Sequence, residues 1–143
     1  MPEPQHPIST LLFNHKTWLI LSLFWIGCIA VLSLMASPPT IESLQVKDKI
    51  LHFGAYALLA LLLGLTFYCW PSRWSRPWLL SGVISITFGG IVELLQQLMQ
   101  QGRTAEWGDF AANMAGVLLV CVVFRHIVAL LCPPKQDEEA QGG

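Results

Sequence analysis

Polar side chains that could perform chemistry gather near the ends of three apolar segments of this chain. Asp48, His52 and Tyr56 follow one another at four-residue intervals, and Glu93 and Gln96 lie three residues apart. Residues three or four apart share one face of an α-helix. A histidine beside carboxylates can transfer protons, hold a metal ion or hydrogen-bond a ligand. The spacing therefore predicts two helical faces that contribute to a site.

A third polar group precedes the last apolar segment. Asp109 and Asn113 are four residues apart, and Arg103 comes six residues before Asp109. These residues could extend the same site. The alternative is that Asp109 is the N-cap of a helix and that Arg103 binds lipid phosphate, and the sequence leaves both interpretations open.

Glu93 is the single acid within the apolar residues 78–99. It lies six residues before the end of that segment, which is roughly 9 Å along a helix that rises 1.5 Å per residue. A carboxylate at that depth in a membrane needs a partner. His52, Lys49 and Arg103 are the cations available to it. The sequence favours a functional role for Glu93 over an inert helix contact.

The candidate catalytic residues are His52, Glu93 and Asp109. The same three side chains could supply one imidazole and two carboxylates to a metal ion. No pair of histidines at helical spacing supports such a site, and the sequence predicts neither a metal nor a cofactor. No serine or cysteine nucleophile neighbours His52 in the sequence, so an enzyme here would act through water or between bound groups.

The segments that carry these residues are typical of membrane helices. Of the 143 residues, 54% are hydrophobic and 12% are charged, and the mean hydropathy is +0.56. A net charge of -1 gives no basic surface for nucleic acid. About 20 apolar residues in a helix cross a bilayer core. The sequence therefore predicts an all-α membrane protein, a bundle of four transmembrane helices over residues 18–36, 50–70, 78–99 and 110–131.

The short flanks of these segments predict the orientation. Positive residues are retained on the cytoplasmic side, and one side carries five Lys and Arg against three on the other. This predicts both ends inside, with cytoplasmic disordered segments at 1–16 and 133–143 around a membrane domain at 17–132. The loops at 37–49 and 99–109 would face outward, and all three polar groups would share that outer face.

Small residues predict where two helices pack. Four-residue steps of small side chains let helix backbones approach closely in lipid. The predicted third and fourth helices are therefore expected to pack against each other. The two sets are Ser81, Ser85 and Gly89, and Gly108, Ala112 and Gly116.

The polar residues also carry a resemblance to a known family. The strings are Asp48-Lys49-x-x-His52-Phe53-x-x-Tyr56-x-x-Leu59, Glu93-x-x-Gln96 and Arg103-x5-Asp109-x3-Asn113-x2-Gly116. Over residues 37–120 the chain resembles the VanZ-like family of small membrane proteins. The resemblance implies a four-helix protein of the bacterial cytoplasmic membrane, in a family named for a member that lowers sensitivity to the glycopeptide teicoplanin. The family has no agreed biochemical activity that the resemblance could imply for this chain.

Three functions fit these observations. The first is binding or modulation of an envelope lipid, or of a lipid-linked cell-wall intermediate, with a possible effect on glycopeptide sensitivity. The second is an intramembrane enzyme that acts on a lipid headgroup through His52 with Glu93 or Asp109. The third is a small proton-coupled transporter, which would need a homo-oligomer to form a pathway. The predicted ligand-binding set is Asp48, Lys49, His52, Tyr56, Glu93, Gln96, Arg103, Asp109 and Asn113.

Overall fold

The computed structural model describes residues 14–35, 42–72, 74–99 and 107–131. This part of the chain is helical and contains no strand. Four of its helical stretches are long and apolar enough to span a membrane, which confirms the four predicted helices. The predicted tails, apart from residues 14–16, lie outside the described residues, and so do residues 37–41 and 100–106 of the two predicted outer loops. The elements are α2 (His15–Met35), α3 (Glu42–Tyr68), α4 (Pro77–Leu98), α5 (Trp107–Leu119), the π-helical turn η1 (Val120–Phe124) and α6 (Arg125–Leu131).

The helix ends differ from the apolar segments for local reasons. Helix α3 begins at Glu42, eight residues before the predicted start at residue 50. The apolar length of a segment predicts only the part of a helix that lies within the membrane. The helix itself can continue beyond that part into polar sequence. Helix α4 begins with Pro77, where a proline has no cost because the first turn of a helix leaves its N–H groups unpaired. The fourth span is continuous through α5, η1 and α6.

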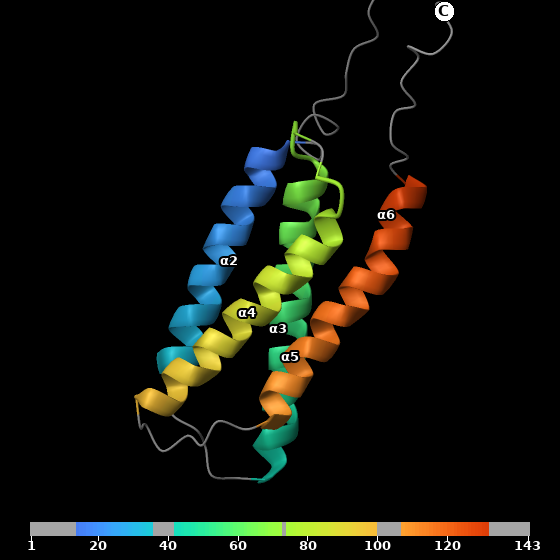
Figure 1. Ribbon diagram of the computed structural model, residues 1–143. Helices are drawn as coiled ribbons and strands as arrows, with labels where there is room; N and C mark the ends of the chain where they lie inside the picture. The colour runs from blue at the N-terminus through green and yellow to red at the C-terminus, as the bar shows by residue number, and fades with distance from the viewer. Residues whose placement is uncertain (1–13, 36–41, 73, 100–106, 132–143) are drawn as a thin grey trace, which may run out of the picture.

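Helix α3 is the centre of the bundle. It contacts α2, α4 and α5, and these helices surround it in Figure 1. Its residues Leu59 and Ala60 are fully buried, and Trp78 of α4 packs into the same core. Large apolar side chains on the outer surfaces remain uncovered, among them Phe24 and Leu130. A surface of uncovered apolar side chains is the arrangement that a lipid environment stabilises.

The small residues of α5 pack on α3. A Cβ atom on Gly116 would overlap the carbonyl oxygen of Phe53, so the two backbones are in direct contact there. A Cβ on Gly108 would meet the side chain of Lys49. The expected pairing of this set with the third predicted helix therefore needs correction, because α3 occupies the face that Gly108 and Gly116 leave open.

The small residues of α4 also meet α3. The Ser81 hydroxyl donates a hydrogen bond to the carbonyl of Ala60. A Cβ on Gly89 would lie 3.0 Å from the ring of Tyr56 on α3 and 3.3 Å from the amide of Asn113 on α5. Helices α4 and α5 do contact each other, as predicted. Each of them, however, has a larger contact with α3 than with the other.

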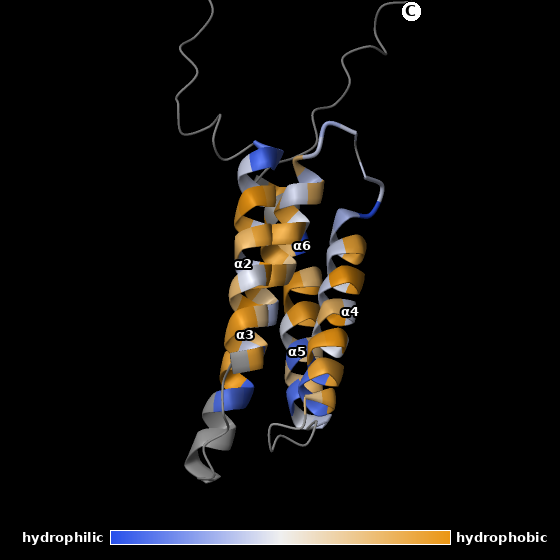
Figure 2. Cartoon of the chain, turned by 90° about the vertical axis from the view of Figure 1, so that its left-hand side faces the viewer, coloured by the Kyte–Doolittle hydropathy of each residue, from blue (hydrophilic) through white to orange (hydrophobic). Residues whose placement is uncertain are grey.

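The polar residues lie at one end of the bundle. Figure 2 shows hydrophilic residues near the start of α3 and around the facing ends of α4 and α5. Helix α2 begins and α6 ends at the opposite end (Figure 1). Because successive helices run in alternating directions, residues far apart in the sequence meet at this end. The structure thus brings the three predicted polar groups to one place.

Candidate functional site

His52 is at the centre of the polar end. It is only 8% exposed, and its Nδ1 lies 3.2 Å from the side-chain oxygen of Asn113, which is fully buried on α5. Because an amide oxygen only accepts hydrogen bonds, Nδ1 is the donor. The imidazole ring is also stacked on Tyr56, at 6.4 Å between ring centroids and 5° between planes. Helix α5 thus fixes both the position and the tautomer of His52.

Three carboxylates surround this imidazole. Asp48, one turn earlier on α3, lies 3.9 Å from Nε2, and Glu93 of α4 lies 3.9 Å from Nδ1. A ligand atom of Asp109 lies within 4.8 Å of ligand atoms of Asp48 and His52. Glu93 and Asp109 are each 8% exposed. Three different helices therefore supply acids to one buried histidine.

Asp109 is not the N-cap that the sequence offered as an alternative. Helix α5 begins at Trp107 and places Asp109 in its first turn. An acid in that turn is stabilised by the positive end of the helix dipole. The same turn directs the carboxylate toward α3, where it joins the cluster around His52.

Lys49 and Gln96, two other predicted site residues, contact neighbouring helices. The side chain of Lys49 lies against α5 at Gly108. Gln96 donates from its amide to the carbonyl of Ser33 at 2.7 Å and so ties α4 to α2. Arg103 lies outside the described residues. The structure therefore brings Asp48, Tyr56, Glu93, Asp109 and Asn113 to His52, whereas Gln96 contacts the backbone of another helix.

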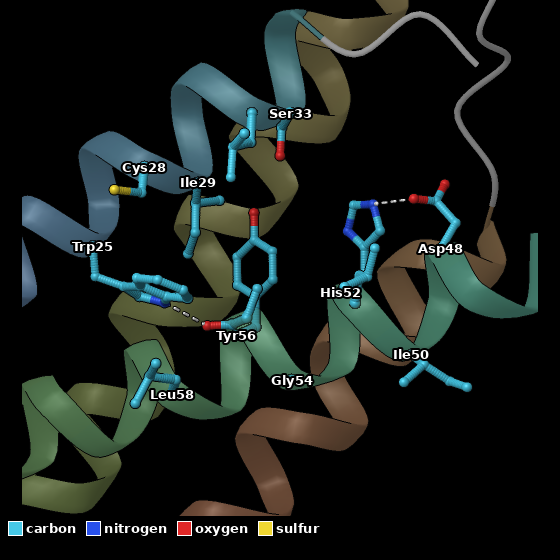
Figure 3. A pocket seen from close by; sticks show the side chains of 13 residues that line it. Trp25, Cys28, Ile29, Ser33, Asp48, Ile50, His52, Gly54, Tyr56 and Leu58 are labelled. Atoms are coloured by element: carbon cyan, nitrogen blue, oxygen red, sulfur yellow. Dashed lines mark hydrogen bonds and ion pairs between the residues drawn. The ribbon is translucent and has the colours of Figure 1, made fainter. Parts of the chain in front are cut away.

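A groove of about 560 Å³ runs between α2 and α3 beside this cluster. Figure 3 shows His52 and Asp48 at one end of it and Trp25 and Leu58 toward the other. Most of its walls are apolar. The lining residues are Trp25, Cys28, Ile29, Leu32, Ser33, Asp48, Ile50, Leu51, His52, Gly54, Ala55, Tyr56 and Leu58.

The sequence analysis missed the contribution of α2 to this groove. That helix has no charge between Trp18 and Met35, so it carried no polar signal. One signal was available: Trp25 lies well inside the segment rather than at a membrane interface, where tryptophan is usual. Its indole N–H needs an acceptor, and it donates to the carbonyl of Ala55 at 2.9 Å. This bond holds the two walls of the groove together.

Several buried polar atoms inside the bundle have no hydrogen-bond partner among the described residues. They are the Tyr56 hydroxyl, the Ser85 hydroxyl and the side-chain nitrogen of Asn113. Tyr56 and Asn113 both approach Gly89. Buried polar groups are rarely left unpaired in folded proteins, so such a group indicates a place for water or a ligand.

Fold and site together define a four-helix bundle with an acidic, histidine-centred polar end and an adjoining apolar groove. No family model, curated protein or solved structure matches the chain. The resemblance to the VanZ-like family therefore rests on the sequence strings.

A substitution at Gln96 tests whether this residue joins two helices or binds a ligand. Gln96→Met should lower the free energy of unfolding by about 1 kcal/mol, because the Ser33 carbonyl loses its donor. Ser33 lies in the last turn of α2, where carbonyls have no donor within the helix. The measurement is thermal or denaturant unfolding in mild detergent.

The matched control is Gln97→Met, at the exposed neighbouring position. It should change stability by no more than about 0.5 kcal/mol. Equal stability of Gln96→Met and Gln97→Met would contradict the tie between α4 and α2.

Proposed function

We propose that this chain is a four-pass membrane protein that holds one amphipathic lipid in the groove between α2 and α3. The lipid headgroup would lie at Asp48 and His52, and its hydrocarbon chain would lie along Trp25 and Leu58. The observation that carries the proposal is the groove itself, whose polar and apolar ends are separated along the helix axis.

The length of the groove supports this occupant. Asp48 and Leu58, at its two ends on α3, are ten residues apart, which is about 15 Å along a helix. A bilayer core is about 30 Å thick, so the groove covers the depth of one leaflet. Its volume of about 560 Å³ is also within the range of about 300–1,000 Å³ found for ligand pockets.

The charge of the polar end favours a headgroup that donates hydrogen bonds. Asp48, Glu93 and Asp109 are acceptors when ionised, so they suit hydroxyl or amino groups better than a bare phosphate. Sugar-bearing lipids, including lipid-linked cell-wall intermediates, offer such donors. An envelope lipid of this class therefore fits the site, and modulation of that lipid is the route by which glycopeptide sensitivity would be affected.

The residues that carry the resemblance to the VanZ-like family also lie at this site. Asp48, His52, Glu93, Asp109 and Asn113 come from three separate strings and meet in one cluster. We therefore keep a VanZ-like protein of the bacterial cytoplasmic membrane as part of the proposal, with both chain ends inside and the cluster at the outer face. A reporter fused after Gly143 should be cytoplasmic; an external reporter would reverse this orientation.

Turnover of the bound lipid is a second candidate function. It is favoured by the two carboxylates, Asp48 and Glu93, that lie 3.9 Å from the ring of His52. Such an arrangement lets a histidine accept or donate a proton at a headgroup.

The test fills the groove with a leucine. Neither Gly54 nor Gly27 has an atom within 4 Å of where a Cβ would lie, and of the two only Gly54 lines the groove. Gly54→Leu should reduce co-purifying lipid about tenfold, because the leucine side chain would occupy groove volume, and a loss of about 1.4 kcal/mol in binding free energy is a tenfold loss of affinity. Gly27→Leu, the matched control, should retain it. The readout is mass spectrometry of lipids after purification in mild detergent.

Equal lipid content in the two variants would contradict the proposed groove. Release of a smaller product by the parent, but not by His52→Ala, would replace binding with turnover as the function.

A further inference from the structure

We propose that Asp48, His52 and Asp109 bind a divalent metal ion of the zinc or manganese class. This goes beyond the lipid groove and departs from the sequence prediction, which found no local pair of ligands. The ligands instead come from α3 and α5, two helices that the sequence could not pair.

The geometry of the three side chains suits an ion. Their ligand atoms all lie within 4.8 Å of one another. Bonds of about 2.0–2.2 Å place two ligand atoms at most about 4.4 Å apart, so small side-chain movements complete the site. The backbone contact of Gly116 with Phe53 holds α5 against α3 close by. The two helices that carry the ligands are therefore in a fixed relation.

The hydrogen bond of His52 prepares the ring for a metal. Its Nδ1–H donates to Asn113, so in the neutral ring Nε2 carries the lone pair, and Nε2 is the nitrogen near Asp48. In this tautomer Nε2 and the Asp48 carboxylate could both bind one ion. Metal-binding histidines usually donate their second ring N–H in this way, which fixes the tautomer and orientation.

The local charge also calls for a cation. Asp48, Glu93 and Asp109 place three acids around the ring, and two of them are buried. Lys49, which lies against the first turn of α5, is the one permanent cation at this end whose side chain the structure describes. Buried charges are tolerated when they are paired or bind a metal. A divalent ion would add positive charge to this acidic cluster.

The ion also has a role at the groove, and this step rests on the proposed function. Asp48 and His52 line the groove (Figure 3). Three protein ligands leave coordination positions open, and those positions would face the groove. A headgroup that carries both sugar hydroxyls and phosphate would then fit the site. The ion would accept a phosphate oxygen, which the acids alone would repel, and the hydroxyls would donate to carboxylate oxygens that do not bind the ion.

The experiment measures binding of the metal alone. The purified protein in mild detergent is stripped with a chelator and titrated calorimetrically with ZnCl₂ and with MnCl₂. We expect one ion per chain in the parent, and an affinity at least tenfold lower in His52→Gln, Asp48→Asn and Asp109→Asn. The matched control His126→Gln changes an exposed histidine on α6 and should bind as the parent does.

Misfolding is excluded by a second measurement. The metal should raise the Tm of the parent and of His126→Gln, but not of Asp48→Asn, whose substituted side chain is 37% exposed in the parent and tolerates change. Absence of a bound ion in the parent, or equal affinity in His52→Gln, would overturn the metal site.

The lipid step is separated from the metal site by Gly54→Leu. That variant should bind the metal normally while losing the lipid. Chelation should release a phosphate-bearing lipid from the parent. Unchanged retention of the lipid after chelation would overturn the bridging role of the ion. The metal titration tests the metal site independently of this result.

Discussion

Gly116→Ala is expected to lower the free energy of unfolding by about 3 kcal/mol, the upper end of the usual cost of overpacking. The added Cβ would overlap the Phe53 carbonyl oxygen and would lie 3.1 Å from its carbonyl carbon and 3.2 Å from the nitrogen of Ala57. These atoms are backbone, and so no rotamer change can relieve the overlap. Helices α3 and α5 would have to separate.

This separation should also reach the polar cluster. Asn113 lies three residues before Gly116 on the same helix, and its bond to His52 spans α5 and α3. We therefore expect Gly116→Ala to weaken the proposed binding of metal and lipid together with stability. The measurement is thermal or denaturant unfolding in mild detergent, followed by analysis of bound ligands.

Gly27→Ala is the matched control, because no atom lies within 4 Å of its added Cβ. It should be neutral or stabilising by up to about 1 kcal/mol, since alanine is the better helix former. Equal stability of Gly116→Ala and Gly27→Ala would contradict the direct backbone contact between α3 and α5.

Asn113→Leu is expected to cost about 2 kcal/mol, although leucine and asparagine have the same number and branching of side-chain heavy atoms. The substitution leaves the buried Nδ1–H of His52 without the acceptor it has in the structure, and an unsatisfied buried donor costs about 1–3 kcal/mol. The orientation of the imidazole would also be lost. Metal affinity should fall about 10- to 100-fold, as it does when the group that orients a metal ligand is removed.

A double-mutant cycle with His52→Phe tests this coupling. His52→Phe removes the unsatisfied donor, so adding it to Asn113→Leu should cost less than adding it to the parent. A coupling of about 1–2 kcal/mol in unfolding free energy would fit a buried bond between two helices. Strictly additive effects would show that His52 and Asn113 do not stabilise each other.

The sequence alone predicted the four spans and the end of the bundle where the polar residues meet. Both follow from local properties. Apolar length marks a segment that crosses a membrane, and the four-residue spacing of Asp48, His52 and Tyr56 places them on one face of a single helix. Alternating helix directions then bring Glu93 and Asp109 to the same end.

Only the tertiary structure decided which helices touch and what each polar residue contacts. It packed α3 against α2, α4 and α5, assigned Gln96 to the backbone of α2, and made Trp25 part of a groove wall. The physical reason is that a distance between helices depends on side-chain volumes from several segments at once. Gly116 shows this directly: its missing Cβ matters because the carbonyl of Phe53 occupies the space, and no pattern within α5 reveals which backbone will lie there.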